Sequence, residues 1–304
     1  MRKKLVFFLK IAVGIIILAL LLYKVGIGRI LNTASSMNLW FWIPLLIVYI
    51  ISFIFSIINF SILFRALGYK IPFSRMARYY LLSWTFALIT PGRLGDFSLA
   101  AFTKNEKVPV GEGTAVVVMD RIITLVVVLL FGLLGFFIFF SGTDRLGLII
   151  ISVALIAGII FAVFSEKVRS VIRKLILRKY ADKFRGFSKS LIMIVKTRKK
   201  FLALNLLVTL LKYFFLNGVI ILLFFMSFGY NVSMIYVLPI SAVAMLIGLI
   251  PVTINGLGIK TSVVVFLYLQ LGIPTAVAAS VDLIDTAFRY VLGLILLNTV
   301  QVKK

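Results

Sequence analysis

The sequence predicts an all-α fold, a polytopic membrane helix bundle, from three observations. Of the 304 residues, 62% are hydrophobic and only 14% are charged, and the mean hydropathy is +1.18. Several apolar runs reach the roughly 20 residues that a helix needs to cross a hydrocarbon layer about 30 Å thick. The runs are continuous rather than alternating, which argues against a transmembrane β-barrel. Because backbone amides in lipid must find partners within their own segment, we expect these runs to be helices.

We expect about six full spans and two re-entrant broken-helix hairpins, arranged as an inverted repeat within one integral membrane domain, 1–304. The expected spans are 5–23, 40–67, 110–140, 146–164, 201–228 and 276–297. The expected broken segments are 79–104 and 233–271. The first half of the domain covers about 1–165 and the second half about 201–304.

The distribution of basic residues predicts the topology. The net charge of +24 arises from 33 Lys and Arg against 9 acidic residues. The basic residues gather between apolar runs, as they do in cytoplasmic loops, which argues against nucleic-acid binding and favours contact with anionic lipid headgroups at the cytoplasmic face. We expect a multi-pass plasma-membrane protein with both termini in the cytoplasm, which places 24 Lys and Arg inside and 3 outside. This split requires that 79–104 returns to the side from which it enters.

The segment 166–200 differs from the other connections. It holds thirteen basic residues against two acidic ones, and its apolar residues recur at steps of three and four. This periodicity predicts a basic amphipathic helix on the cytoplasmic surface. The alternative is a solvated basic loop.

The stretch "ITPGRLGDFSLAAF", residues 89–102, interrupts apolar sequence with Pro91, Gly92 and Gly95. The arm before it, 79–90, has 12 residues, or about 18 Å at helical rise, which is too short to span. Proline followed by glycine ends a helix at this point. The chain is therefore expected to turn inside the membrane, where irregular backbone is tolerated only within protein or beside a wet cavity.

The stretch "LIPVTINGLGIK" repeats this pattern in the second half, with Pro251, Gly256 and Gly258 as the breaking residues. Its flanks lack basic residues, so we expect it to enter from outside, opposite to the first broken segment. Paired broken helices in inverted halves indicate a transporter site near the midplane. The alternative is a pair of ordinary helix kinks that bind nothing.

Three elements in order resemble the lysylphosphatidylglycerol synthase transmembrane region, a flippase-like family of membrane proteins. They are "TPGRLGDFSLAAF", "GTAVVVMDRIITLVV" and "PVTINGLGIKTSVVVFLYLQLGIPTAVAAS", and the resemblance covers about 5–300. It implies translocation of a lipid, which in the two-part relatives carries an amino acid attached by a separate soluble domain. We expect no such domain within these 304 residues. Lys260 and Thr261 stand where many relatives carry Arg and Glu, which leaves the identity of the lipid open.

Five charged residues are expected to bind a lipid headgroup. A charge at the bilayer centre costs at least about 2.5–3.5 kcal/mol and therefore needs a partner or wet surroundings. An arginine fork can bind a phosphate through two parallel hydrogen bonds. The acidic member is expected to orient the neighbouring arginine, cap the returning half-helix or meet a cationic headgroup. The set is Arg93, Asp96, Arg121, Lys260 and Arg289.

Three further carboxylates are expected to form a coupling or structural charge network. Asp120 precedes Arg121 directly, so the two side chains point apart, and pairing of Arg121 with Asp96 or of Asp120 with Arg93 is expected. Asp282 and Asp285 share one helical face with Arg289. They form either a proton or cation site or a salt-bridged structural cluster.

Two lysines in apolar sequence, Lys10 and Lys212, are expected to extend to the interface or to pair structurally.

Three functions are consistent with these residues. The first is a flippase or transporter for an anionic or aminoacylated phospholipid, or a polyprenyl-phosphate-type lipid. The second is a membrane-embedded enzyme that modifies a lipid, with Asp96 and Asp120 as base or Mg²⁺ ligands. The chain contains no His and no Cys, so we expect no catalytic residue, no metal and no cofactor. The third is a non-transporting membrane partner of a separate lipid synthase or glycosyltransferase, bound through 166–200.

Overall fold

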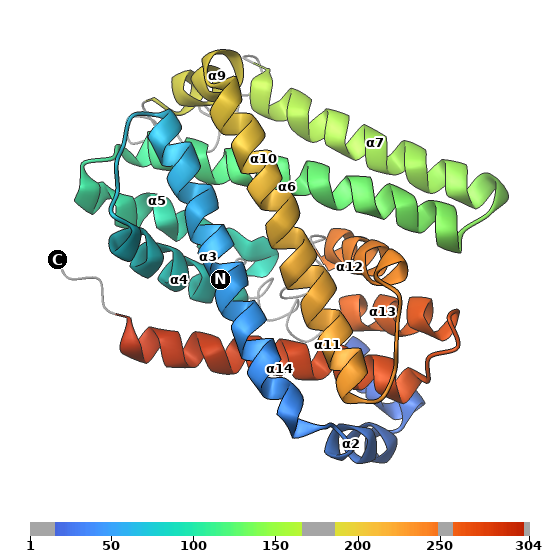
Figure 1. Ribbon diagram of the computed structural model, residues 1–304. Coiled ribbons are helices and arrows are strands. Elements are labelled where there is room, and N and C mark those ends of the chain that lie inside the picture. The colour runs from blue at the N-terminus through green and yellow to red at the C-terminus, as the bar shows by residue number, and fades with distance from the viewer. Residues whose placement is uncertain (1–15, 166–185, 249–257, 301–304) are drawn as a thin grey trace, which may run out of the picture.

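The computed structural model describes residues 16–165, 186–248 and 258–300, which fold into helices joined by short connections (Figure 1). No strand occurs in these ranges, and the all-α class is confirmed. A helix over Ile16–Val25 bends by 76° into α2, Ile27–Ser35. The longer helices that follow are α3 (Trp42–Ala66), α4 (Phe73–Ile89), α6 (Val110–Phe139), α7 (Gly142–Phe164), α9 (Phe187–Thr197), α10 (Lys199–Tyr213), α11 (Ile220–Ser227), α12 (Met234–Gly248), α13 (Ile259–Leu269) and α14 (Thr275–Thr299).

Three of the described helices are long and apolar enough to cross a membrane, or four if the bent pair at the start counts as one span. They are Leu39–Ala66, Val110–Phe139 and Lys199–Ser227. In the last of these, a π-helical stretch, Phe214–Val219, joins α10 to α11. α14 has 25 residues, but it carries three charged residues in its middle. The expected total of six spans stays a prediction.

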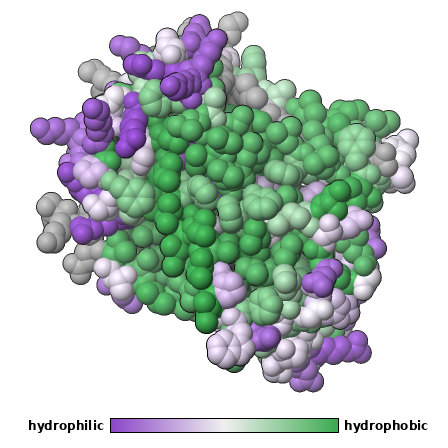
Figure 2. Space-filling view, in the orientation of Figure 1, coloured by the Kyte–Doolittle hydropathy of each residue, from purple (hydrophilic) through white to green (hydrophobic). Residues whose placement is uncertain are grey.

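The surface has the character of a membrane protein. Figure 2 shows a broad apolar belt, with hydrophilic residues gathered beyond it near α9 at one end and near α2 at the other. Large apolar side chains are exposed on the described helices, among them Ile47, Phe137, Ile150, Leu207 and Leu294. Such a continuous apolar surface is unfavourable in water and suits the hydrocarbon layer.

The first broken segment differs in detail from the prediction. Its entering arm, α4, begins at Phe73 rather than at Tyr79 and has 17 residues, or about 25 Å. Pro72 precedes it, and a proline is favourable at a helix start. The returning arm consists of α5, Ser98–Phe102, and the 3₁₀ turn Thr103–Glu106 that follows it.

Two of the connections contain helices. The stretch 24–37, which its sequence predicts to be a short polar connection of amphipathic character, contains the helix α2, which packs against α14. Of the basic segment 166–200, residues 166–185 lie outside the described ranges. In the rest, α9 is helical, as predicted, and its apolar side, with Leu191 and Ile194, packs against α6. Its place on the cytoplasmic surface stays a prediction.

The two broken segments approach from opposite ends of α6. Arg75, near the start of α4, pairs at 2.8 Å with Glu106 at the end of the returning arm, so the first hairpin opens beside the start of α6. The second hairpin, α12 and α13, opens at the other end, where Tyr236 packs against Phe139 with ring centroids 6.4 Å apart. Figure 1 shows the two hairpins on opposite sides of the bundle. This arrangement agrees with the expected opposite entry, while a true inverted repeat stays a prediction.

Candidate functional site

The break after α4 is a tight turn, the 3₁₀ segment η2 over Pro91–Phe97. Gly92 and Arg93 adopt left-handed backbone angles, φ 60° and 57°, which reverse the chain. Gly95 N–H donates to Thr90 Oγ1 at 2.6 Å, and a side chain at Gly95 would place its Cβ 2.2 Å from the backbone of Phe86. The turn therefore packs directly onto α4 and holds the next residue, Asp96, against the bundle interior.

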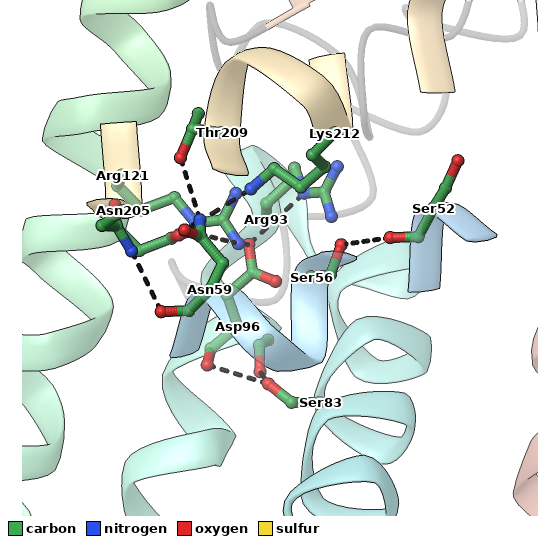
Figure 3. A network of polar contacts seen from close by, with 12 residues as sticks. Ser52, Ser56, Asn59, Ser83, Arg93, Asp96, Arg121, Asn205, Thr209 and Lys212 are labelled. Carbon is green, nitrogen blue, oxygen red and sulfur yellow. Dashed lines mark hydrogen bonds and ion pairs between the residues drawn. The ribbon is translucent and has the colours of Figure 1, made fainter. Parts of the chain in front are cut away.

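Asp96 binds one arginine within the turn, Arg93, and one on α6, Arg121, and so joins the turn to α6. Its Oδ2 lies 3.3 Å from Arg93 Nε and 3.1 Å from Arg121 Nη2 (Figure 3). The Ser83 hydroxyl donates to the backbone carbonyl of Asp96 at 2.8 Å and fixes this part of the turn. The predicted pair of Arg121 with Asp96 is present. The predicted helix cap is wrong, because the N-terminus of α5 receives no side-chain cap.

Asp120 lies one residue before Arg121 and is fully buried. Its Oδ1 accepts a hydrogen bond from Asn59 Nδ2 at 2.7 Å and lies 3.7 Å from Lys212 Nζ on α10. Asn59 is itself held by Thr209 and Asn205, also on α10. Figure 3 shows Asn59, Asn205, Thr209 and Lys212 converging next to Arg121. The alternative pairing of Asp120 with Arg93 is not observed. The second cation beside Asp120 is Arg121, whose Nη2 lies 3.8 Å from Oδ2, so the expectation that these adjacent side chains point apart is wrong.

A second set of charges lies on α13 and α14. Lys260 Nζ is 2.7 Å from Asp282 Oδ1, and Thr261 donates its hydroxyl to Oδ2 of the same carboxylate at 2.7 Å. Arg289 Nη2 lies 2.9 Å from Asp285 Oδ2, as the four-residue spacing predicts. Tyr49 on α3 donates its hydroxyl to the same Asp285. Each carboxylate of this set thus has one cation and one hydroxyl as partners.

Both sets face one cavity of about 160 Å³. The cavity lies between the two hairpins, and α3, α6, α10, α12 and α14 contribute to its wall. Five cations line it, namely Arg93, Arg121, Lys212, Lys260 and Arg289. Among the described residues, Tyr268 Oη and Arg121 Nε are buried without a hydrogen-bond partner, and both residues line the cavity. The wall of the cavity is therefore both cationic and polar.

The structure brings together the four basic residues that the sequence predicts for the headgroup site. Asp282 and Asp285 also line the cavity. Asp96 and Asp120 are not among its lining residues, but they pair with the lining cations Arg121 and Lys212. Gly258 stands at the start of α13 with φ 81°. Pro251, Gly256 and Lys10 lie outside the described residues.

Lys212 pairs with Asp120, one of the two alternatives that the sequence predicts for it, but sequence reasoning missed that it also lines the cavity. The signal was a lysine within an otherwise apolar run, 201–228, as costly there as any of the charges that were singled out.

The family model for the lysylphosphatidylglycerol synthase transmembrane region matches residues 7–296, nearly the whole chain. The chain belongs to this family. It shares 25% identity over 302 residues with the UPF0104 membrane protein MJ1595 of Methanocaldococcus jannaschii, a match that covers 92% of this chain and 89% of that protein. It shares 23% identity over 310 residues with the UPF0104 membrane protein PH1989 of Pyrococcus horikoshii, which covers 91% of each. The protein is therefore an integral membrane protein, and the name of its family refers to the synthesis of a lipid.

Proposed function

We propose that the protein is a lipid flippase or transporter that moves the headgroup of an anionic or aminoacylated phospholipid across the plasma membrane. The observation that carries this proposal is the convergence of Arg93, Arg121, Lys212, Lys260 and Arg289 on one cavity. Cations at membrane depth are costly unless an anionic partner or water compensates them. A phosphate group is an anion that an arginine fork binds with directional hydrogen bonds.

The depth of the site supports transport. Arg121 lies eleven residues into α6, or about 17 Å along a helix of 30 residues and about 45 Å. The cavity wall therefore stands well away from both ends of the bundle. A headgroup held there has left one surface and has not reached the other, while its acyl chains stay in the hydrocarbon layer.

The pairing of the carboxylates favours transport over the enzymatic alternative. Asp96, Asp120, Asp282 and Asp285 each lie within 4 Å of a lysine or arginine. A carboxylate held by a cation is a weaker base than a free one, because the cation stabilises the charged form. A partnership with a separate lipid synthase or glycosyltransferase is compatible with transport and stays a proposal.

Lipid scrambling in reconstituted vesicles tests the function. A headgroup-labelled phosphatidylglycerol is placed in both leaflets, and a membrane-impermeant reductant measures how fast the inner pool becomes accessible. We expect Arg93→Ala and Arg121→Ala to slow exchange at least about tenfold, the effect of about 1.4 kcal/mol. Arg75→Ala is the matched control, because this arginine pairs with Glu106 away from the cavity. If folded Arg93→Ala and Arg121→Ala proteins exchange lipid at the wild-type rate, the proposal is wrong.

The proposed orientation has its own test. The chain contains no cysteine, so a single cysteine can be introduced at Lys70 or at Gly229 without background labelling. With cytoplasmic termini, an impermeant maleimide added to whole cells should label the second position and not the first. The reverse labelling pattern would show that both termini lie outside the cytoplasm, and it would leave the description of the cavity unchanged.

A further inference from the structure

The two halves of the cavity differ in net charge. In the first half, three cations, Arg93, Arg121 and Lys212, share two carboxylates, Asp96 and Asp120. With all five groups ionised, this cluster carries a net charge of +1. Its ion pairs form one chain from η2 through α6 to α10, so the excess charge belongs to the cluster as a whole.

The second half is neutral. Lys260 has Asp282, and Arg289 has Asp285, at distances of 2.7 and 2.9 Å. Hydroxyl groups of Thr261 and Tyr49 complete the hydrogen bonding of these two carboxylates. Every charge in this half is therefore compensated within the protein.

Lys212 is the cation of the first half that is least committed to a protein partner. Its Nζ is 3.7 Å from Asp120 Oδ1, which is too long for a hydrogen bond. The same carboxylate oxygen already accepts a 2.7 Å hydrogen bond from Asn59. The ammonium group lines the cavity with its side chain only 12% exposed. Its charge is thus directed at an occupant of the cavity.

We infer that Lys212 sets the charge of the site to +1 and selects a headgroup whose phosphate carries one negative charge, a phosphodiester, over a phosphate monoester. This inference rests on the proposed function. A monoester carries about −1.5 to −2 at pH 7. Bound in this cluster, it leaves negative charge uncompensated in a partly dehydrated cavity, which is costly. A diester leaves none.

Competition between two lipids whose phosphates differ in this charge tests the inference. The purified full-length protein in detergent is incubated with equimolar short-chain phosphatidylglycerol, a diester, and phosphatidic acid, a monoester. Native mass spectrometry then measures the ratio of the two complexes. We expect the wild type and Lys212→Arg to favour the diester by about tenfold or more, since an uncompensated charge in a low-dielectric cavity has a large effect on binding.

Three variants distinguish an effect of the net charge of the cluster from an effect of the single contact made by Lys212. Lys212→Gln lowers the cluster charge to zero and should lose diester binding by at least about tenfold. Asp120→Asn raises the charge to +2 and should shift the preference toward the monoester. The double variant Lys212→Gln/Asp120→Asn restores +1 and should recover diester binding and preference. It also removes the buried carboxylate that loses its lysine partner, so it tests the inference even if Lys212→Gln fails to fold.

The outcomes distinguish this inference from the proposed function. Equal binding of both lipids by the wild type, or a double variant that stays as defective as Lys212→Gln, would overturn the inference while transport could stand. Selective binding without scrambling in vesicles would support the inference and overturn transport. Binding of neither lipid would overturn both.

Discussion

The guanidinium group of Arg121 on α6 lies 3.1 Å from the carboxylate of Asp96 in the turn that ends α4. This contact ties the first broken segment to the longest helix of the bundle. Asp96 also holds Arg93, so one carboxylate positions two of the cations that line the cavity. The turn and the cavity wall are therefore mechanically linked.

Removing Asp96 should destabilise the protein strongly. Asp96→Ala leaves two partly buried guanidinium groups without their shared partner, and loss of one member of a buried pair costs about 3–5 kcal/mol. Chemical unfolding in detergent micelles measures the change. Arg75→Ala is the control, because its pair with Glu106 involves an arginine side chain that is 53% exposed, and such pairs contribute about 0–1 kcal/mol. Equal losses in the two variants would contradict the role given to Asp96.

Two substitutions of Arg93 should separate its backbone from its side chain. Arg93 has φ 57° and ψ 31°, a conformation that glycine adopts freely and alanine does not. Arg93→Gly should therefore be more stable than Arg93→Ala by about 1 kcal/mol. Both lack the guanidinium group, so both should slow lipid exchange to the same extent. If Arg93→Gly transports like the wild type, the side chain does not bind the headgroup.

The turn should tolerate a methyl group at one glycine and not at the other. At Gly95 a Cβ would lie 2.2 Å from the backbone of Phe86, so Gly95→Ala must push the turn away from α4. We expect a cost of about 3 kcal/mol or more. A Cβ at Gly92 would have no neighbour within 4 Å, so Gly92→Ala should destabilise the protein only through its positive φ, by about 1–2 kcal/mol. Thermal unfolding compares them, and the opposite order would show that the turn does not pack on α4.

The hydroxyl of Tyr49 should matter through Asp285. Tyr49→Phe removes the hydrogen bond to this fully buried carboxylate and should cost about 2 kcal/mol, as for hydrogen bonds to charged groups. The ring contacts of Tyr49 with Phe288 are retained. Tyr23→Phe is the control, since Tyr23 is exposed and the change should stay within about 0.5 kcal/mol. An unchanged unfolding midpoint in Tyr49→Phe would show that Arg289 alone compensates Asp285.

Local chemistry made the breaks predictable. Proline and glycine at 91–92 stop a helix wherever they stand, so the end of α4 near Ile89 follows from the sequence. α4 begins at Phe73, six residues before the predicted start at 79, because Arg75 and Arg78 resemble the charges of a basic loop between spans. An amphipathic helix end carries such charges equally well, and only the contact of Arg75 with Glu106 shows where the arm begins.

The sequence by itself determined that the chain is a helical membrane protein with two interrupted segments and a set of charges that need partners. Apolar length, backbone chemistry and the cost of a buried charge are properties of short segments. Tertiary structure alone decided which partners meet, and it assigned Lys212 to Asp120 although 91 residues separate them along the chain. The energy of a buried charge depends on groups within a few ångströms in space, and helix packing sets those neighbours.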